Sequence, residues 1–271
     1  MNQLPMLHDA LLTIDNRVAT LTLNRDDVRN ELTGTRLIDD IEETVRWINR
    51  DESVSVLVIT GNGKAFSAGG NIKHMLARQS SFAGDVYEVQ TRYRSGIQRI
   101  PLALSRLDVP TIAAINGSAI GAGFDLACMC DIRLASDVAV MAESFVNIGI
   151  VPGDGGVWFL QRLVGPQRAA ELCLTGRSVS ASEALALGLV LDVVSPEKLM
   201  TRAAELAHSI AAKPPQALRL TKRLLKSAQG MEFPEFLDLC AAFQGMCHNT
   251  KDHLEAVGAV LDKRRPHFVG R

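Results

Sequence analysis

The sequence lacks the features that mark membrane, secreted and metal-dependent proteins. Its longest apolar runs are interrupted by Gly, Asp or Arg, so none resembles a membrane span. Residues 1–17 contain His8, Asp9 and Asp15 and have neither the basic start nor the apolar core of a signal peptide. The five cysteines are an odd number, which favours reduced, buried thiols over a disulfide framework. We therefore expect a cytoplasmic protein, and because the six histidines never approach His-Glu-x-x-His spacing, no metal site.

Several function classes are also disfavoured by what is missing. A formal net charge of −1 gives no general attraction to nucleic acid or to a membrane surface, so neither is an expected partner. The segment 121–126 begins like a dinucleotide fingerprint, but Leu126 stands where the third glycine should be. There is no Gly-x-Ser-x-Gly elbow and no Gly-x₄-Gly-Lys-[Ser/Thr] loop. Bound nucleotide cofactors and a serine nucleophile are therefore not expected.

Two glycine-rich corners are the most informative features that the sequence does contain. They are residues 66–71, FSAGGN, and residues 117–125, GSAIGAGFD. Each follows a β-rich apolar run, at 54–60 and 111–115, and precedes a helix-like stretch, at 72–77 and 126–130. Two such corners can aim free backbone N–H groups at one point, where they would stabilise an oxygen that becomes negative during reaction. This pattern indicates enolate chemistry.

The rest of the chain divides into a mixed α/β part and a helical part. A hairpin at 11–14 and 18–23, a helix at 33–49, strands at 132–135, 139–141 and 189–194, and helices at 157–163 and from 180 are expected. Residues 78–94 lack a clear pattern and are expected to be a mobile segment over a site. Beyond residue 195 only helical spacing remains, at 198–212, 216–228, 235–247 and 251–263. We predict an α/β core over 1–195 and a helical region over 196–271 that packs on the core or on another subunit.

Several short segments along the chain form an ordered set of motifs. The segments are LNR at 23–25, RN at 29–30, VITG at 58–61, AFSAGG at 65–70, AAING at 113–117, CDIR at 130–133, LTGR at 174–177 and KRRP at 263–266. In this order they resemble the crotonase superfamily, the enoyl-CoA hydratase/isomerase family, from about residue 11 to the end. The resemblance implies a spiral of repeated ββα units with a C-terminal helical trimerisation region, assembled as a homotrimer or a dimer of trimers. It also implies an acyl-CoA thioester as substrate, with coenzyme A carried as part of that substrate and no separate cofactor.

The same resemblance assigns residues that bind the substrate. The main-chain N–H groups of Gly70 and Ala122 correspond to the pair that holds the thioester carbonyl. Ala122 replaces the commoner glycine, which a backbone donor tolerates if the chain turns in the same way. Lys222 or Lys226 could supply positive charge for the phosphates of coenzyme A. The remaining expected contacts are Val28, Arg29, Glu31, Ala68, Asn71, Ile72 and Phe145, of which Glu31 and Asn71 depart from the usual Ala and Asp.

The acidic residues depart most from the family pattern. Hydratases of this family hold a water between two glutamates, and those positions fall here at Asp125 and at Phe145, which cannot transfer a proton. Asp154, in the turn at 152–156, is either a further catalytic carboxylate or the N-cap of the next helix. Glu143 is a third candidate base, because extended backbone over 140–145 would put it on the same side as Phe145.

This inventory favours double-bond isomerisation of an acyl-CoA, with Asp125 moving a proton with or without Asp154. Hydration of an unusual enoyl-CoA is the nearest alternative. Hydrolysis or C–C cleavage of a CoA ester, or a non-catalytic CoA-ester binder, also stays open. The acyl group cannot be read from the sequence, although Phe145 hints at a bulky or aromatic one.

Overall fold

A computed structural model describes residues 3–271 of the protein. Its larger sheet has six strands in the order β1-β2-β3-β5-β7-β10. Strands β1 and β2 form the antiparallel hairpin that the sequence predicts, and the remaining neighbours are parallel. The strands are β1 (Ala10–Asp15), β2 (Val18–Leu23), β3 (Val56–Gly61), β5 (Thr111–Ile115), β7 (Ile132–Ser136) and β10 (Asp192–Val194).

A smaller sheet arises because the chain repeats one supersecondary unit. After β3, β5 and β7 the chain passes at once into a second short strand, and these second strands, β4, β6 and β8, pair in parallel. A helix then follows each second strand, giving three ββα units in succession. The four strands of the smaller sheet are β4 (Ala65–Ser67), β6 (Ser118–Ile120), β8 (Val140–Ala142) and β9 (Ser178–Ser180).

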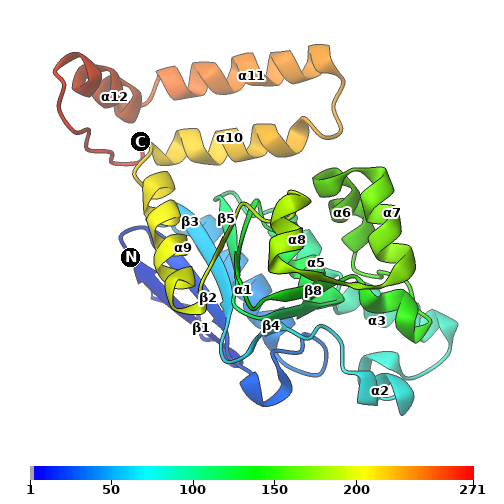
Figure 1. Ribbon diagram of the computed structural model, residues 1–271. Coiled ribbons are helices and arrows are strands. Elements are labelled where there is room, and N and C mark those ends of the chain that lie inside the picture. The colour runs from blue at the N-terminus through cyan, green and yellow to red at the C-terminus, as the bar shows by residue number, and fades with distance from the viewer. Residues whose placement is uncertain (1–2) are drawn as a thin grey trace.

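Helices cover both faces of the larger sheet, as Figure 1 shows. Helix α9 packs on one face, and α1, α4 and α5 lie on the other. The helices are η1 (Asp26–Val28), α1 (Leu37–Arg50), α2 (Ile72–Leu76), η2 (Ser80–Phe82), α3 (Val86–Ser95), α4 (Arg99–Ser105), α5 (Ala122–Met129), η3 (Ser144–Ile148), α6 (Gly156–Val164), α7 (Pro166–Thr175), α8 (Ala181–Ala186), α9 (Pro196–Ala211), α10 (Pro215–Ser227), α11 (Phe233–His248) and α12 (Lys251–Leu261).

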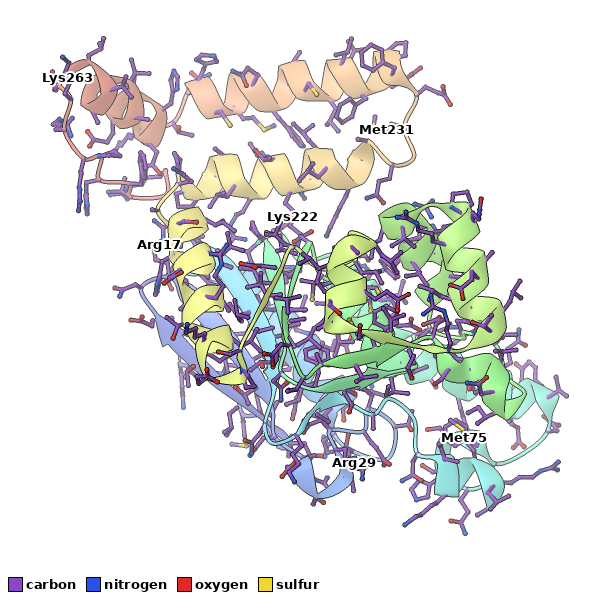
Figure 2. The ribbon with its side chains drawn as sticks, viewed as in Figure 1. Arg17, Arg29, Met75, Lys222, Met231 and Lys263 are labelled. Atoms are coloured by element: carbon purple, nitrogen blue, oxygen red, sulfur yellow. The ribbon has the colours of Figure 1, made fainter. Side chains whose placement is uncertain are left out.

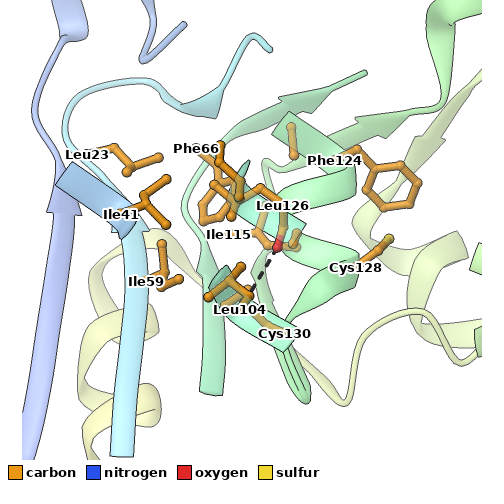
Figure 3. Close-up of a cluster of buried hydrophobic side chains, with 14 of the residues drawn as sticks. Leu23, Ile41, Ile59, Phe66, Leu104, Ile115, Phe124, Leu126, Cys128 and Cys130 are labelled. Atoms are coloured by element: carbon orange, nitrogen blue, oxygen red, sulfur yellow. Dashed lines mark hydrogen bonds between the residues drawn. The ribbon is translucent and has the colours of Figure 1, made fainter. Parts of the chain in front are cut away.

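Successive side chains of a strand point to opposite faces of the larger sheet, and a hydrophobic core lies on each face. Val56 and Val58 of β3 point to α9, whose small residues Ala203 and Ala207 allow close approach to the sheet. Leu57 and Ile59, on the opposite side of the strand, join the larger core with α1 and α5. Part of that core is drawn in Figure 3, which includes Leu23, Ile41, Phe66, Ile115 and Leu126. The parallel strands read as continuous apolar runs because both of their faces are buried.

The structure adds to one expectation about local structure and corrects another. Residues 78–94, expected as a mobile segment over a site and without a clear pattern, contain η2 and most of α3, which begins at a capping box formed by Asp85 and Glu88. Helix α5 begins at Ala122 and not near Leu126, so the second glycine corner runs directly into the first helical turn. The five cysteines are free thiols, and Cys128 and Cys130 are buried. Within residues 3–271, no helix combines the length and the apolar character that a membrane crossing requires.

The chain beyond residue 195 is helical, and α10 and α11 extend side by side beyond the sheets (Figure 1). Lys222 on α10 joins this layer to the core, because its ammonium group bonds to Asp131 at 2.8 Å and to the carbonyl oxygen of Val109 at 2.6 Å. Helix α11 has no buried residue among those described, and Leu254 and Val260 on α12 are exposed. The trimer and dimer-of-trimers assemblies remain predictions.

Candidate active site

The two glycine corners meet in space because neither leaves room for a side chain. A Cβ atom on Gly69 would lie 2.5 Å from the carbonyl oxygen of Ile120 and 3.0 Å from the amide nitrogen of Ala122. Gly69 also has a φ of +76°, a conformation that side chains other than glycine rarely adopt. Conversely, a Cβ atom on Gly123 would lie 2.2 Å from the carbonyl oxygen of Ser67. The start of α5 is thus held against the end of β4.

This contact places two free backbone donors beside one pocket. The neighbouring amides are occupied, since Gly69 N–H donates to Ser67 Oγ at 3.1 Å and Asn71 N–H donates to Thr33 Oγ1 at 2.9 Å. Within residues 3–271, the N–H groups of Gly70 and Ala122 have no such partner. Ala122 is the first residue of α5, where helical N–H groups lack an intrahelical acceptor. Both residues line the same pocket, so their N–H groups remain available to a ligand.

The pocket itself is small, with a cavity volume of about 40 Å³. That volume accommodates on the order of one to three water molecules. The segment from α2 to α3 closes one side, since Met75, Phe82 and Tyr93 line the cavity together with residues of the core. Phe145 lines another side, and its ring lies 3.5 Å from where a Cβ atom on Gly121 would stand.

Three carboxylic acids form a buried cluster next to this pocket. Asp125 lies in the first turn of α5, Glu143 follows β8, and Asp154 precedes α6. Their exposed fractions are 1%, 1% and 4%, and of these three only Asp154 lines the pocket. The Asp125 carboxyl is in hydrogen-bonding contact with both Glu143 and Asp154. Asp125 is therefore the middle member of the cluster.

The three carboxyl groups contact one another without a cation or an outside hydrogen-bond donor, so a shared proton has to join them. Across residues 3–271, no N–H or O–H group outside the cluster donates to any of its six carboxylate oxygens. Two carboxylates can bond to one another only if one of them is protonated. Burial, followed by the charges of Asp154 and Glu143, raises the pKa of Asp125 well above its usual range. Burial also raises the pKa of Glu143 to about 7, and that of Asp154.

These shifts indicate how the protons are distributed. The hydrogen bond from Asp125 lowers the pKa of Asp154 and opposes the effect of burial. Burial and the two neighbouring acids thus favour the protonated form of Asp125, whereas the hydrogen bond from Asp125 favours the ionised form of Asp154. Asp154 in turn raises the pKa of Tyr93, although burial is the larger cause. A pocket-facing carboxylate beside two amide donors can remove a proton from carbon and stabilise the resulting negative oxygen.

The other expected ligand-binding residues lie along one edge. The loop after η1 is tied to the first glycine corner, since Ala68 N–H donates to the Arg29 carbonyl at 2.9 Å. Asn71 donates to Glu31 through its side-chain amide at 2.8 Å and caps α2. Glu31 and Asn71, the two residues that depart from the family pattern at this edge, thus bond to one another. Val28 and Ile72 complete this edge, and Figure 2 shows Arg29 and Met75 at the end of the molecule opposite α10 and α11.

Two sequence-based suggestions do not fit this geometry. Lys222 is 3% exposed and bound to Asp131, so it cannot supply charge to a phosphate. Lys226 donates to the carbonyl oxygens of Leu104, Ser105 and Leu107, and burial lowers its pKa to about 8. The backbone over 140–145 is also not extended throughout, because β8 ends at Ala142 and Ser144 begins η3. Phe145 therefore faces the pocket, whereas Glu143 faces Asp125.

Comparison with known proteins agrees with the fold. The family model described as "Enoyl-CoA hydratase/isomerase" matches residues 13–271. The chain belongs to the enoyl-CoA hydratase/isomerase family. It is 32% identical to the trans-2-decenoyl-[acyl-carrier-protein] isomerase of Streptococcus mutans, covering 97% of this chain and 98% of the relative. It is 33% identical to the crotonyl-CoA hydratase of Syntrophomonas wolfei, covering 96% and 98%.

Further relatives and solved structures extend the same similarity. The 1,2-epoxyphenylacetyl-CoA isomerase of Escherichia coli is 33% identical over 98% of this chain and 100% of its own. The crystal structure of an enoyl-CoA hydratase from Bacillus anthracis matches with a TM-score of 0.90 at 32% identity, over 97% of this chain and 100% of that one. The fold is therefore the crotonase fold, and the protein is an enzyme of the hydratase/isomerase type. Because the similar relatives include both isomerases and hydratases, the family alone does not determine the reaction.

Proposed function

We propose that this enzyme moves the double bond of an acyl-CoA thioester, with Asp154 as the base. The observation that supports this most is the placement of the acids: one carboxylate, Asp154, lines the pocket, and Phe145 lines it where a hydratase has its second glutamate. Hydration needs a water positioned between two acidic groups, whereas isomerisation needs one group that takes a proton and returns it. The acid inventory suits the second task better.

In the proposed reaction the thioester carbonyl oxygen accepts hydrogen bonds from the N–H groups of Gly70 and Ala122. The Asp154 carboxylate removes a proton from the carbon next to the carbonyl, and the electron pair of that C–H bond moves onto the carbonyl oxygen. The two amides stabilise this enolate. The enolate then re-forms the carbonyl, the double bond shifts, and the proton returns to the carbon two positions further along the chain. No proton, electron or water is gained or lost overall.

Asp125 supports this cycle from behind the pocket. Its proton is shared with Asp154 through their contact, so it stabilises the ionised form of the base before reaction. Coenzyme A is then expected along the edge formed by Val28, Arg29, Glu31 and the residues 68–72. The names of the relatives support a thioester substrate, since they act on acyl groups attached to coenzyme A or to acyl-carrier protein.

The test is to incubate the enzyme with matched 2-enoyl-CoA and 3-enoyl-CoA esters and to follow the products by NMR. Isomerisation predicts conversion of one series into the other, abolished by Asp154→Asn and retained by Asp137→Asn, a change at an exposed aspartate. Conversion of 2-enoyl-CoA into 3-hydroxyacyl-CoA would instead support the hydratase alternative, which the hydratase relatives favour. Release of free coenzyme A thiol would support hydrolysis or cleavage. Binding without any conversion would refute a catalytic role for these esters.

A further inference from the structure

The turn that carries Asp154 has little of its own to hold the carboxylate in one direction. Asp154 lies between Gly153 and Gly155, and glycine allows more backbone conformations than any other residue. Gly155 is the N-cap of α6, and the Asp154 side chain does not cap that helix. Within the part of the chain that the structure describes, no donor outside the acid cluster bonds to either carboxylate oxygen of Asp154. We therefore expect the direction of this carboxylate to depend on what holds the backbone of the turn.

A side chain from a distant part of the sequence bonds to that backbone. Gln98, which immediately precedes α4, donates from its side-chain amide Nε2 to the Gly153 carbonyl oxygen at 2.7 Å. This oxygen belongs to the same planar peptide group as the Asp154 N–H, so the bond fixes the peptide plane from which Asp154 extends. Among residues 3–271, no other side chain bonds to the backbone of residues 151–155.

The ring of Tyr93, on α3, contacts the same turn. A Cβ atom on Gly153 would lie 2.6 Å from Tyr93 Cε1 and 2.9 Å from its Cδ1, so the ring packs directly against this glycine. The Gln98 N–H donates to the Tyr93 carbonyl oxygen at 3.1 Å, which joins the two contacting residues in one local unit. Tyr93 also lines the pocket together with Asp154. One short segment, residues 93–98, thus holds the turn with a ring and with an amide.

This segment is anchored to the core independently of the turn. Ile97 and Ile100, on either side of Gln98, are 7% and 1% exposed and belong to the larger hydrophobic core. Arg99 bonds to Asp39 of α1 at 2.8 Å. Gln98 therefore extends from a fixed support, which a side chain needs if it is to orient a flexible turn.

We propose that Gln98 is a positioning residue that directs the Asp154 carboxylate into the pocket by way of the Gly153 carbonyl. Without the Gln98 amide, the peptide group between Gly153 and Asp154 is free to rotate, because the glycines on both sides of Asp154 offer little resistance. Rotation would turn the carboxylate away from the substrate carbon, and a misplacement of about 1 Å lowers a rate by about 10²-fold. This inference rests on the proposed function, in which Asp154 is the base.

The test compares Gln98→Met and Gln98→Glu with the wild-type enzyme. Methionine has a similar length but no donor, and glutamate has the same shape but, when ionised, accepts a hydrogen bond and donates none. At about pH 8 both variants should lower kcat for isomerisation by about 10- to 100-fold and change KM for the CoA ester by less than about twofold. Gln90→Met, at an exposed glutamine of α3, is the matched control and should keep the wild-type kcat.

Two results would overturn the role of Gln98. One is a wild-type kcat in Gln98→Glu or in Gln98→Met, because the bond to Gly153 would then have no effect on the base. The other is a raised KM or loss of the folded state with kcat of the remaining folded enzyme unchanged, because Gln98 would then support the structure alone.

A partial reaction separates this proposal from the proposed function. Removal of the proton next to the carbonyl of a saturated acyl-CoA needs the base and the two amides but no double bond, and in D₂O it replaces that hydrogen by deuterium. Gln98→Met should slow this exchange, followed by NMR, by about 10- to 100-fold, whereas Gln90→Met should not. Slowed exchange in Gln98→Met, in an enzyme that isomerises no enoyl-CoA, would support the role of Gln98 and refute isomerisation. Isomerisation with equal exchange in Gln98→Met and wild-type enzyme would overturn the role of Gln98 and leave isomerisation intact.

Discussion

Replacing Gly156 by alanine tests whether the position of Asp125 matters for the reaction. The added Cβ atom would lie 2.0 Å from Asp125 Oδ1, 2.3 Å from its Cγ and 2.4 Å from its Oδ2. An ordinary contact needs about 3.4 Å, and the difference from 2.0 Å means that the carboxyl must shift by about 1.4 Å. A shift of that size removes the hydrogen-bonding contact with Asp154 or with Glu143. We therefore expect kcat/KM to fall by about 10²-fold, the usual effect of a 1 Å misplacement.

The stability of this variant separates a local shift from unfolding. Overpacking of a core typically costs about 1–3 kcal/mol, whereas replacing glycine by alanine within a helix gains about 1 kcal/mol. Because Gly156 is the first residue of α6, the free energy of unfolding should fall by no more than about 2 kcal/mol. Thermal unfolding followed by circular dichroism measures this change.

The matched control is Gly245→Ala, also within a helix. A Cβ atom at Gly245 would have no neighbour within 4 Å, so activity should stay at the wild-type level and stability should not fall. Wild-type kcat/KM in Gly156→Ala would refute the placement of Asp125 next to the reacting base. Loss of the folded state in Gly156→Ala would show that the packing at this point is less tolerant than we expect.

Three further outcomes are expected. Asp154→Asn should lower kcat by about 10²–10⁴-fold with little change in thermal stability, and a smaller loss than in Asp125→Asn would contradict its role as the base. The pKa of Glu143 is raised from 4.5 to about 7 in the folded state, so folding is linked to proton uptake and the free energy of unfolding falls as pH rises through that window. At about 1.36 kcal/mol per pH unit this loss is at most about 3 kcal/mol, and Glu143→Gln should flatten the decline in Tm between pH 4.5 and about 7. Lys222→Ala removes the cation beside Asp131, which keeps only its hydrogen bonds from Thr111, and should lower Tm without raising KM for the CoA ester. A raised KM at unchanged Tm would place Lys222 in the substrate site after all.

The sequence is sufficient to predict the fold because its signals are long and repeated. The hairpin, the strand β5 and the helices after residue 195 follow from periodicity alone, and the ordered motifs identify the ββα repeat. The short strands β4, β6 and β9 have three residues each, which is too few for alternation to be recognised. Helix α3 is not predicted for another reason. Its apolar spacing is weak and no residue in it is buried, although the residues of its capping box are present in the sequence.

The candidate site is less accessible to sequence reasoning, because it depends on where one strand ends. Asp125 and Asp154 can be proposed from motifs, but their contact arises only when α5 and α6 pack together. Glu143 is assigned to the wrong side if residues 140–145 are taken as extended, since the turn into η3 after Ala142 redirects it. Asp154 faces the pocket and Asp125 lies behind it. Residue spacing does not predict this difference, because it depends on how separate segments of the chain pack together.

The most direct test of the central claim is a crystal structure with a bound, non-isomerisable CoA thioester. We expect the thioester carbonyl oxygen within about 2.7–3.1 Å of the amide nitrogens of both Gly70 and Ala122. We also expect an Asp154 oxygen near the carbon that loses its proton. A carbonyl oxygen bound elsewhere, with these two amides facing solvent or another part of the ligand, would contradict the proposed chemistry.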